Sequence, residues 1–425
     1  MALRVSDNRR YLIHGNGKPF FYLGDTAWEL IHRLKREEAD LYLRDRAQKG
    51  FTVIQAVVLA EQNGLREPNA YGDLPLHDED PAHPNEAYFQ HVDWIVRRAN
   101  ALGLYVGLLP TWGDKVHRMW GAGPEIFTPD NAEPYGEFLG RRYRGSHIIW
   151  ILGGDRPVET NRHLEIWRAL AAGLRKGDGG THLITYHPMG WMSSADKLHA
   201  EPWLDFNMIQ SGHSRRNAPN YELISRDYQR VPIKPCMDGE PCYEDHPVNW
   251  REENGYFSDY DVRKAAYWAL FAGAHGHTYG AQPIWQMWAP PRPKVSFVRR
   301  SWREALALPG AAQMRHVKEL MLPRVRRLPD QDLLPSDAGS EGEHIRATRD
   351  EHGRWALVYL PVGQPVSIDT GKLRARTLNV SWLDPRSGTR HKASTCRASG
   401  VMGFAPPSSG LGQDWVLILE DSRAS

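Results

Sequence analysis

The sequence contains few of the residues that mark a disulfide scaffold, a zinc module or a membrane protein. Only three of its 425 residues are cysteines. Cys236, Cys242 and Cys396 can form neither a disulfide framework nor a Cys-x-x-Cys metal site. No stretch approaches the roughly 18 apolar residues of a transmembrane helix. The net charge is only +2, with acids and bases interspersed, so we expect no nucleic-acid surface and no membrane anchor.

The first ten residues also lack the apolar stretch of an export signal. As written, the sequence therefore predicts a cytoplasmic protein, and nothing in it points beyond a monomer. A chain from which a signal had been trimmed would look the same and would be periplasmic or secreted. At 425 residues the chain is long enough for a large domain with a smaller module, and 41% hydrophobic residues can bury a sizeable core.

Tryptophan and tyrosine, by contrast, are abundant, with 16 and 17 residues. Many of these aromatic side chains are expected in the core. Six tryptophans, however, follow predicted strands, where an exposed ring is suited to stacking on a sugar. These are Trp28, Trp112, Trp120, Trp191, Trp285 and Trp288.

Short apolar runs alternate eight times with longer helical patterns, which predicts a (β/α)8 TIM barrel of the α/β class. The expected strands are residues 20–25, 52–59, 104–110, 147–153, 182–186, 206–211, 234–240 and 276–279. Their near-continuous hydrophobic character is typical of parallel strands buried on both faces. A hairpin that turns at Asn16-Gly17 precedes them. We assign residues 1–325 to the barrel and its hairpin.

From about residue 326 the pattern changes to short strands separated by turn signals. Strands are expected at residues 344–348, 354–359, 366–369, 377–383 and 415–420. Residues 326–425 are therefore predicted to form a small all-β sandwich. Its expected role is to pack on the barrel, with carbohydrate binding as an alternative.

Two predicted strands end in carboxylates. Residues 147–155 (HIIWILGGD) end at Asp155, and residues 234–240 (KPCMDGE) end at Glu240. Active sites of these barrels lie at the carboxyl ends of the strands, and paired carboxylates suit a glycosidase. Either acid alone could instead be a helix N-cap. We assign Asp155 as general acid/base and Glu240 as nucleophile, with Glu244 as the second choice.

Alternation along a strand refines this assignment. It places Asp238 and Glu240 on one face, which we take as the barrel interior, with Asp238 one layer deeper. Burial beside Trp150 or another aromatic ring would raise the pKa of one acid, whereas hydrogen bonds would lower that of the other. Tyr279 is expected to donate a hydrogen bond to Glu240.

Other strand ends supply polar and aromatic groups for a sugar. Trp28 and Trp112 are expected to form the floor and the wall of a blind pocket, with Trp112 on the rim, and the loop at residues 64–85 is expected to help close one end. His187 and His213 are expected to donate hydrogen bonds to sugar hydroxyls. The full predicted substrate-binding set is Asp25, Trp28, Gln55, Trp112, His187, Gln210, His213, Asp238 and Tyr279. No cofactor is expected, and the predicted partner is an oligosaccharide or polysaccharide substrate.

Two other classes of function compete with this interpretation. His187, His213, His275 and His277, with Asp25, could form a metal-dependent hydrolase site, but the first strand lacks the usual His-x-His. We therefore expect no metal. The second alternative is a non-catalytic carbohydrate-binding protein. Loss of either acid would favour it, and both acids are present.

Five motifs in order resemble the apiosidase-like family, glycoside hydrolase family 140. They are residues 21–30 (FYLGDTAWEL), 49–56 (KGFTVIQA), 109–113 (LPTWG), 150–155 (WILGGD) and 238–244 (DGEPCYE). Residues 380–388 (VSWLDPRSG) resemble the module, labelled collagen-binding, that follows the barrel in that family.

The resemblance implies an exo-acting hydrolase (EC 3.2.1.-) of pectic side chains, such as those of rhamnogalacturonan II. It implies β-apiosidase activity, with its two acids at Asp155 and Glu240 and retention of configuration. Related glycosidase barrels usually carry Asn-Glu at the end of the fourth strand, whereas this chain has Gly154-Asp155, so a shorter acid must reach the glycosidic oxygen. An exo-glycosidase for another furanose or pyranose is the alternative.

Overall fold

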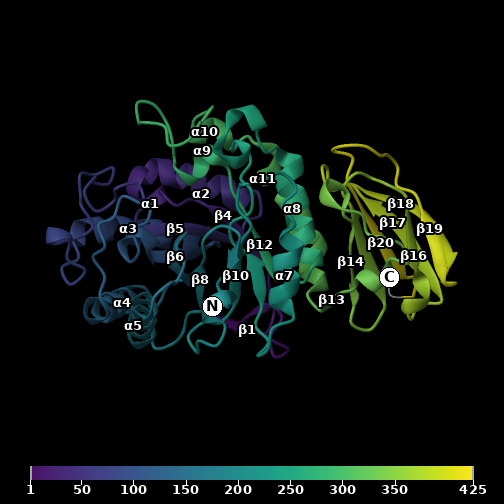
Figure 1. Ribbon diagram of the computed structural model, residues 1–425, viewed down its shortest axis with the longest axis horizontal. Helices are drawn as coiled ribbons and strands as arrows, with labels where there is room; N and C mark the ends of the chain where they lie inside the picture. Colours follow the sequence, from purple (N-terminus) through teal and green to yellow (C-terminus); the bar gives the residue numbers. More distant parts are fainter. Residues whose placement is uncertain (1, 424–425) are drawn as a thin grey trace.

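The computed structural model describes residues 2–423 and consists of a barrel with a β domain beside it (Figure 1). The parallel barrel strands are β4 (Tyr22–Thr26), β5 (Val53–Leu59), β6 (Tyr105–Thr111), β7 (Ile148–Gly153), β8 (Ile184–His187), β10 (Asn207–Gln210), β11 (Cys236–Asp238) and β12 (Gly276–Tyr279). Their spatial order is β8-β7-β6-β5-β4-β12-β11-β10, with the short antiparallel strand β9 (Met192–Ser193) beside β10. The Thr185 hydroxyl donates to the Phe206 carbonyl at 2.7 Å and joins β8 to the segment that enters β10. The predicted (β/α)8 barrel is confirmed.

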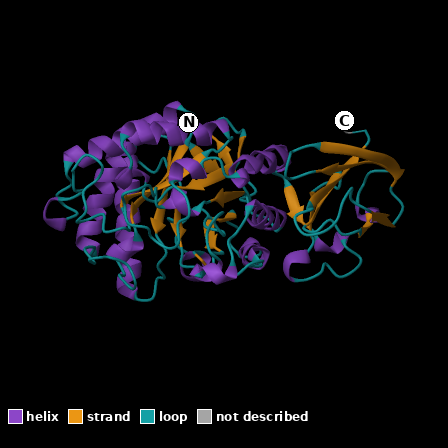
Figure 2. Cartoon of the chain, turned by 90° about the horizontal axis from the view of Figure 1, so that it is seen from above, coloured by secondary structure: helices purple, strands orange, loops and turns teal. Residues whose placement is uncertain are grey.

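Helices cover the outside of the barrel (Figure 2). The longer ones are α2 (Arg36–Gln48), α3 (Glu86–Ala101), α4 (Pro129–Tyr143), α5 (Asn161–Asp178), α7 (Asn220–Tyr228), α8 (Asp259–Phe271) and α11 (Pro309–Met321). Short helices are α1 (Leu30–Arg33), α6 (Ala195–Leu198), α9 (Gln282–Trp285) and α10 (Trp302–Ala305). The ends follow local chemistry: α5 starts after Thr160, whose side chain accepts from the N–H of His163, and stops at Gly179, which has a φ of 71°.

The N-terminal hairpin is confirmed and extended. Strands β2 (Leu12–His14) and β3 (Pro19–Phe20) pair in antiparallel fashion around the predicted turn. Strand β1 (Leu3–Val5) adds a third strand on the other side of β2.

Side-chain alternation decides which residues of each strand face the barrel interior. On β7, Ile149 and Ile151 belong to the inner core. Trp150 therefore points outward, and its Nε1 donates to Asp178 of α5 at 3.0 Å. Trp150 consequently cannot be the aromatic neighbour of the acid pair.

On β11 the expected face was wrong. Met237 belongs to the inner core, so Asp238 points outward. The strand stops at Asp238, and the chain then changes direction at Gly239. Glu240 therefore reaches the strand ends from the turn after β11 and not through alternation along the strand.

The C-terminal domain contains β13 (Arg327–Pro329), β14 (Arg346–Asp350), β15 (Trp355–Leu360), β16 (Val366–Asp369), β17 (Thr377–Leu383), β18 (Arg390–Arg397), β19 (Val401–Phe404) and β20 (Trp415–Asp421). Six strands form an antiparallel sheet in the order β13-β14-β15-β20-β17-β18, and β16 pairs with β19. Val358 and Leu417 on one face of the sheet pack with Ile368 of β16, which gives the predicted two-layered β domain.

The opposite face of this sheet packs on the barrel. Tyr359 of β15 stacks on Tyr267 of α8 with ring centroids 4.8 Å apart. Beside them, buried Arg263 donates to the carboxylate of Asp414 at 2.8 Å. These contacts support a packing role for the domain. Among residues 2–423, no helix has the length and apolar character needed to cross a bilayer.

Candidate active site

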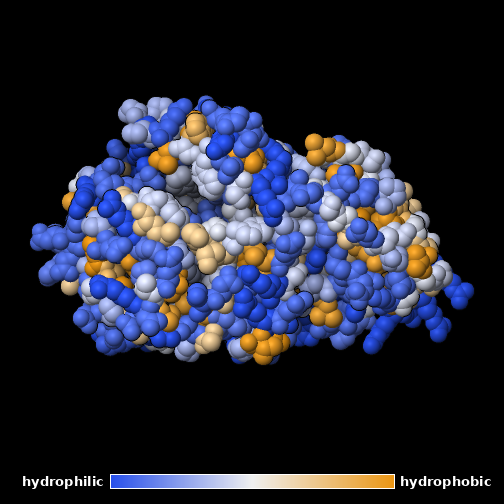
Figure 3. Space-filling view, in the orientation of Figure 1, coloured by the Kyte–Doolittle hydropathy of each residue, from blue (hydrophilic) through white to orange (hydrophobic). Residues whose placement is uncertain are grey.

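A cavity of about 670 Å³ opens at the carboxyl ends of the barrel strands. The barrel half of the molecule is hollowed on its surface (Figure 3). Six residues of the predicted catalytic and substrate-binding sets line the cavity: Trp28, Trp112, Asp155, Gln210, His213 and Glu240. Trp120, Trp191 and Trp285, which were predicted to be suited to stacking on a sugar, line it too. The tertiary structure therefore brings both predicted catalytic acids into one cavity.

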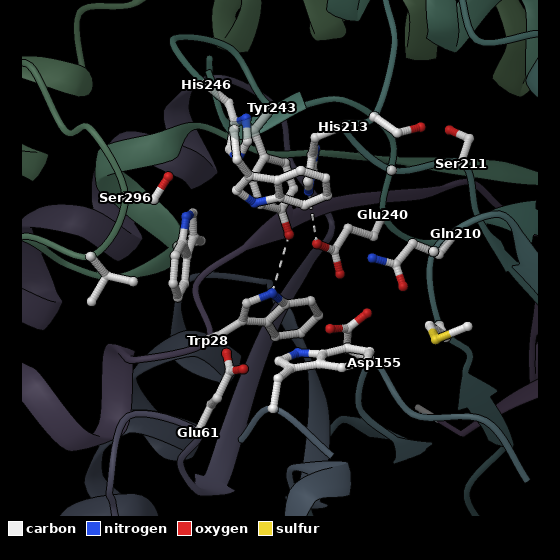
Figure 4. A pocket seen from close by; sticks show the side chains of 18 of the residues that line it. Trp28, Glu61, Asp155, Gln210, Ser211, His213, Glu240, Tyr243, His246 and Ser296 are labelled. Carbon is white, nitrogen blue, oxygen red and sulfur yellow. Dashed lines mark hydrogen bonds and ion pairs between the residues drawn. The ribbon is translucent and has the colours of Figure 1, made fainter. Parts of the chain in front are cut away.

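Asp155 owes its position to an unusual turn after β7. Gly153, Gly154 and Asp155 all have positive φ angles, of 83°, 113° and 56°. A Cβ at residue 154 would lie 2.7 Å from the backbone N of Gly113 and 2.9 Å from the ring of Trp112, so only glycine fits. The left-handed turn directs the Asp155 side chain into the cavity (Figure 4).

Burial raises the pKa of Asp155 to about 6, and the nearby charge of Glu240 acts in the same direction. Arg156 and His187 oppose this shift. The Arg156 Nη1 lies 3.3 Å from the Asp155 carboxylate. Asp155 therefore stays protonated up to a higher pH than an exposed aspartate does.

Glu240 is held by two histidines. The Nε2 of His187 lies 2.8 Å from Oε2 of Glu240. The Nε2 of His213 lies 3.1 Å from Oε1 (Figure 4). The N–H of Asp155 donates to Nδ1 of His187 at 3.3 Å, so the other nitrogen of that ring, which faces Glu240, carries a proton. Burial would raise the pKa of Glu240, but the interactions with both histidines outweigh it and lower the pKa.

The two carboxyl groups thus have opposite tendencies within one cavity. Asp155 tends to keep a proton and Glu240 tends to stay ionised. A pair of this kind can deliver a proton to a leaving group while the other member attacks or stabilises the opposite side of the reacting carbon.

Aromatic rings line the cavity beside these acids. The ring centroids of Trp28 and Trp112 lie 5.1 Å apart. The Nε1 of Trp28 donates to the hydroxyl of Tyr243 at 3.1 Å. Trp112 was expected on the rim, but only 2% of it is exposed. It lines the cavity from within the core, so its removal would disturb packing as well as binding.

Two predicted sugar-binding residues, one on β4 and one on β5, lie outside the cavity. Asp25 is fully buried and accepts hydrogen bonds from Tyr42 and Arg46 of α2, each at 2.5 Å. It therefore ties β4 to the helix layer. Gln55 lies inside the barrel, where its amide donates to the carbonyl of Gly239 at 3.2 Å. Gln55 braces the turn before Glu240 and does not reach the cavity.

Asp238 and Tyr279 also differ from the expectation. Asp238 accepts from the Ser211 hydroxyl at 2.7 Å and from Asn220 of α7 at 3.0 Å. Tyr279 donates to Glu244 at 2.6 Å and not to Glu240. Asp238, Tyr279 and Glu244 are all absent from the cavity lining, which also removes Glu244 as an alternative nucleophile.

Both histidines contact Glu240, which the sequence did not predict. His187 is fully buried beneath the lining and contacts Glu240. His213 lines the cavity, but its Nε2 is likewise directed at Glu240. One nitrogen of each ring therefore faces a carboxylate, and Nδ1 of His213 has no partner among the described residues, so a hydrogen bond from His213 to a sugar hydroxyl stays a prediction.

Several cavity residues were missed by the sequence-based reasoning, namely Glu61, Gln62, Tyr243, His246, Trp250 and Ser296. Glu61 follows the end of β5, and burial raises its pKa to about 8, with Asp155 adding to the shift. Tyr243 stands in the motif that supplied Glu240, which could have drawn attention to it. The loop at residues 64–85 does not contribute to the lining.

The described residues contain no arrangement of side chains that supports the alternative of a metal site. His275 and His277 are buried, and burial lowers the pKa of each to about 3. Across residues 2–423, no three His, Cys, Asp or Glu side chains gather as metal ligands would. His187 and His213 converge on Glu240 and not on a common empty point.

Comparisons with known proteins agree with this architecture. The family described as "Apiosidase-like, catalytic domain" matches residues 6–325. The domain described as "Putative collagen-binding domain of a collagenase" matches residues 328–420. No curated protein matches the chain.

Two solved structures are similar over nearly the whole chain. One, named "Glycoside hydrolase", is 35% identical with a TM-score of 0.92, covering 99% of this chain and 97% of its own. The other is a glycoside hydrolase family 5 protein from Bacteroides vulgatus ATCC 8482, 33% identical with a TM-score of 0.92, covering 99% of this chain and 94% of its own. A family 5 mannosidase from Rhizomucor miehei, at 13% identity and a TM-score of 0.54 over 76% of this chain and 98% of its own, shares the fold.

The family match spans most of the chain, and the cavity holds the carboxylate pair that glycoside hydrolysis requires. The chain therefore belongs to the apiosidase-like family, and it is a glycoside hydrolase.

Proposed function

We propose that the protein is an exo-acting β-apiosidase that removes a terminal sugar from pectic side chains. The observation that carries this proposal is the pair of carboxyls with opposite pKa shifts in one cavity, within a chain of the apiosidase-like family. Buried Trp28 and Trp112 beside the pair offer an apolar surface for the C–H groups of a small sugar.

In the proposed reaction, the Glu240 carboxylate attacks the anomeric carbon while Asp155 donates its proton to the glycosidic oxygen. The bond to the leaving group breaks, and the sugar is held as an ester of Glu240. Asp155, now ionised, removes a proton from a water molecule that attacks the same carbon. The ester bond breaks, and Glu240 is regenerated as a carboxylate. His187 and His213 keep free Glu240 ionised and oriented for the attack.

The substrate is tested by product release. We expect the protein to liberate apiose from apiogalacturonan or rhamnogalacturonan II, and to prefer aryl apiosides over a panel of other aryl furanosides and pyranosides. Chromatography of the released monosaccharide provides the measurement. Preferential release of another sugar would refute the apiosidase assignment, although the protein would still be a glycoside hydrolase.

Stereochemistry tests the proposed role of Glu240. Retention requires carboxyl groups about 5–5.5 Å apart and a covalent intermediate, whereas inversion leaves about 6.5–9.5 Å for a water molecule. We expect the first-formed sugar to have the anomeric configuration of the substrate. Proton NMR recorded before mutarotation gives the answer, and the opposite anomer would show that Glu240 activates water instead of attacking the sugar.

A further inference from the structure

The exposed tryptophans of this protein are concentrated at one place. Of the 16 tryptophans, all of which lie within residues 2–423, only Trp120, Trp191 and Trp250 are exposed, by 57%, 38% and 50%. All three line the cavity that contains Asp155 and Glu240. Large aromatic surfaces left in water usually mark a binding site.

These three rings come from three different loops. Trp120 lies between β6 and α4, Trp191 between β8 and β9, and Trp250 between β11 and α8. Trp28 and Trp112, which line the same cavity, are each only 2% exposed. Aromatic rings therefore occupy two levels, a buried level beside the acids and an exposed level at the mouth.

The backbone at two of the exposed rings is strained. Trp191 and Trp250 have φ angles of 61° and 57°, in the left-handed region that bulky side chains rarely adopt. The N–H of Trp191 donates to the carbonyl of Gln210 at 2.7 Å, and the N–H of Asn249 donates to the carbonyl of His213 at 2.8 Å. Both loops are thus fixed to residues of the cavity wall, and strain maintained in this way is typical of functional positions.

Neighbouring cations and imidazoles also set the orientation of each ring. Arg156 lies 4.2 Å from the ring centroid of Trp120, and Arg215 lies 5.0 Å from that of Trp191. Trp250 meets His213 and His246 edge to face, with centroids 5.8 and 5.6 Å away. The rings are therefore ordered before a ligand arrives, which lowers the entropy cost of binding.

We propose that Trp120, Trp191 and Trp250 form subsites for a carbohydrate chain on the leaving-group side of the scissile bond. This inference rests on the proposed exo-acting function, in which the terminal sugar occupies the deeper level beside Asp155 and Glu240. The units that follow it then extend toward the mouth. A cavity of about 670 Å³ is in the range of sites for drug-sized ligands and has room beyond one monosaccharide. Three rings on separate loops suit a chain of successive sugar rings better than a single flat phenol.

The test compares leaving groups on one glycone, the sugar that the wild-type protein releases from the substrate panel. The glycone is supplied on an oligosaccharide, on a phenolic aglycone and as the glycosyl fluoride, which has no ring in its leaving group. For Trp191→Ala we expect kcat/KM to fall roughly tenfold or more on the oligosaccharide. On the fluoride we expect a change of less than about twofold. Trp120 and Trp250 are left out of the comparison. Trp120 stacks on Arg156, which contacts Asp155, and Trp250 packs on His213, which contacts Glu240.

Trp94→Ala is the matched control, since Trp94 is a half-buried tryptophan on α3 away from the cavity, and it should not discriminate among the substrates. Thermal unfolding confirms that the variants fold.

Equal losses of kcat/KM on the oligosaccharide and the fluoride, or no loss on either, would overturn the proposal. A larger loss of kcat/KM on the phenolic glycoside than on the oligosaccharide would also overturn it. A released sugar other than apiose would refute the proposed function alone, and the comparison would proceed with that sugar. A wild-type protein that cleaves nothing in the panel would overturn both.

Discussion

Replacement of Glu240 by glutamine should lower kcat by about 10⁴-fold or more, because the amide keeps the shape of the side chain but cannot attack the anomeric carbon. The interactions with His187 and His213 that lower the pKa of Glu240 maintain an ionised nucleophile in the native site. Steady-state kinetics on an aryl glycoside of the released sugar give the effect, and thermal unfolding checks that the variant is folded.

A suitable control is Glu159→Gln, since Glu159 is exposed on the loop after β7 and lies outside the cavity lining. It should retain near wild-type turnover. If Glu240→Gln kept more than roughly a tenth of wild-type turnover on a substrate with a poor leaving group, Glu240 would not be the nucleophile. In that case another group in the cavity would have to act as the nucleophile, and Glu61, a carboxylic acid in the lining, would be the next candidate.

For Asp155→Asn we expect a loss of about 10²–10⁴-fold in kcat/KM on a substrate with a poor leaving group, since proton donation from the acid is removed. The loss should be much smaller with a dinitrophenyl leaving group, which departs without protonation. Azide, which needs no base, should increase turnover of the variant on this activated substrate.

The pH profile provides an independent test of Asp155. Its pKa is raised to about 6, and the acid must be protonated, so wild-type kcat/KM should be high below pH 6 and fall as the pH rises through about 6. Asp155→Asn should lack this alkaline limb. An unchanged limb in the variant, or equal losses on good and poor leaving groups, would be incompatible with the assignment of Asp155 as the acid.

Local sequence patterns predicted much of the fold of this protein. Buried strands alternating with amphipathic helices indicated the barrel, because each pattern reflects the repeat of one element and needs no knowledge of distant contacts. The same holds for the HIIWILGGD segment. Its apolar run predicted a buried strand that ends at Asp155, and its two glycines allow the left-handed turn that presents this acid.

The β domain was predicted less completely. Strands β13, β18 and β19 were missed, and β18 shows why, since nearly all of its residues are exposed. An exposed strand at the edge of a sheet lacks the alternation of buried and exposed residues on which the prediction depends.

Interactions between residues far apart in the chain were settled only by the tertiary structure. Asp25 pairs with Arg46 because the helix after β4 folds back over that strand, and Tyr279 reaches Glu244 instead of Glu240. His187 and His213 converge on Glu240 from two other strands. Such pairings depend on strand tilt, on where each strand ends and on how the turns leave the barrel, none of which has a sequence period. The sequence by itself therefore determined the barrel and its two acids, whereas the closure of the barrel decided which side chains hold those acids and which tryptophans line the cavity mouth.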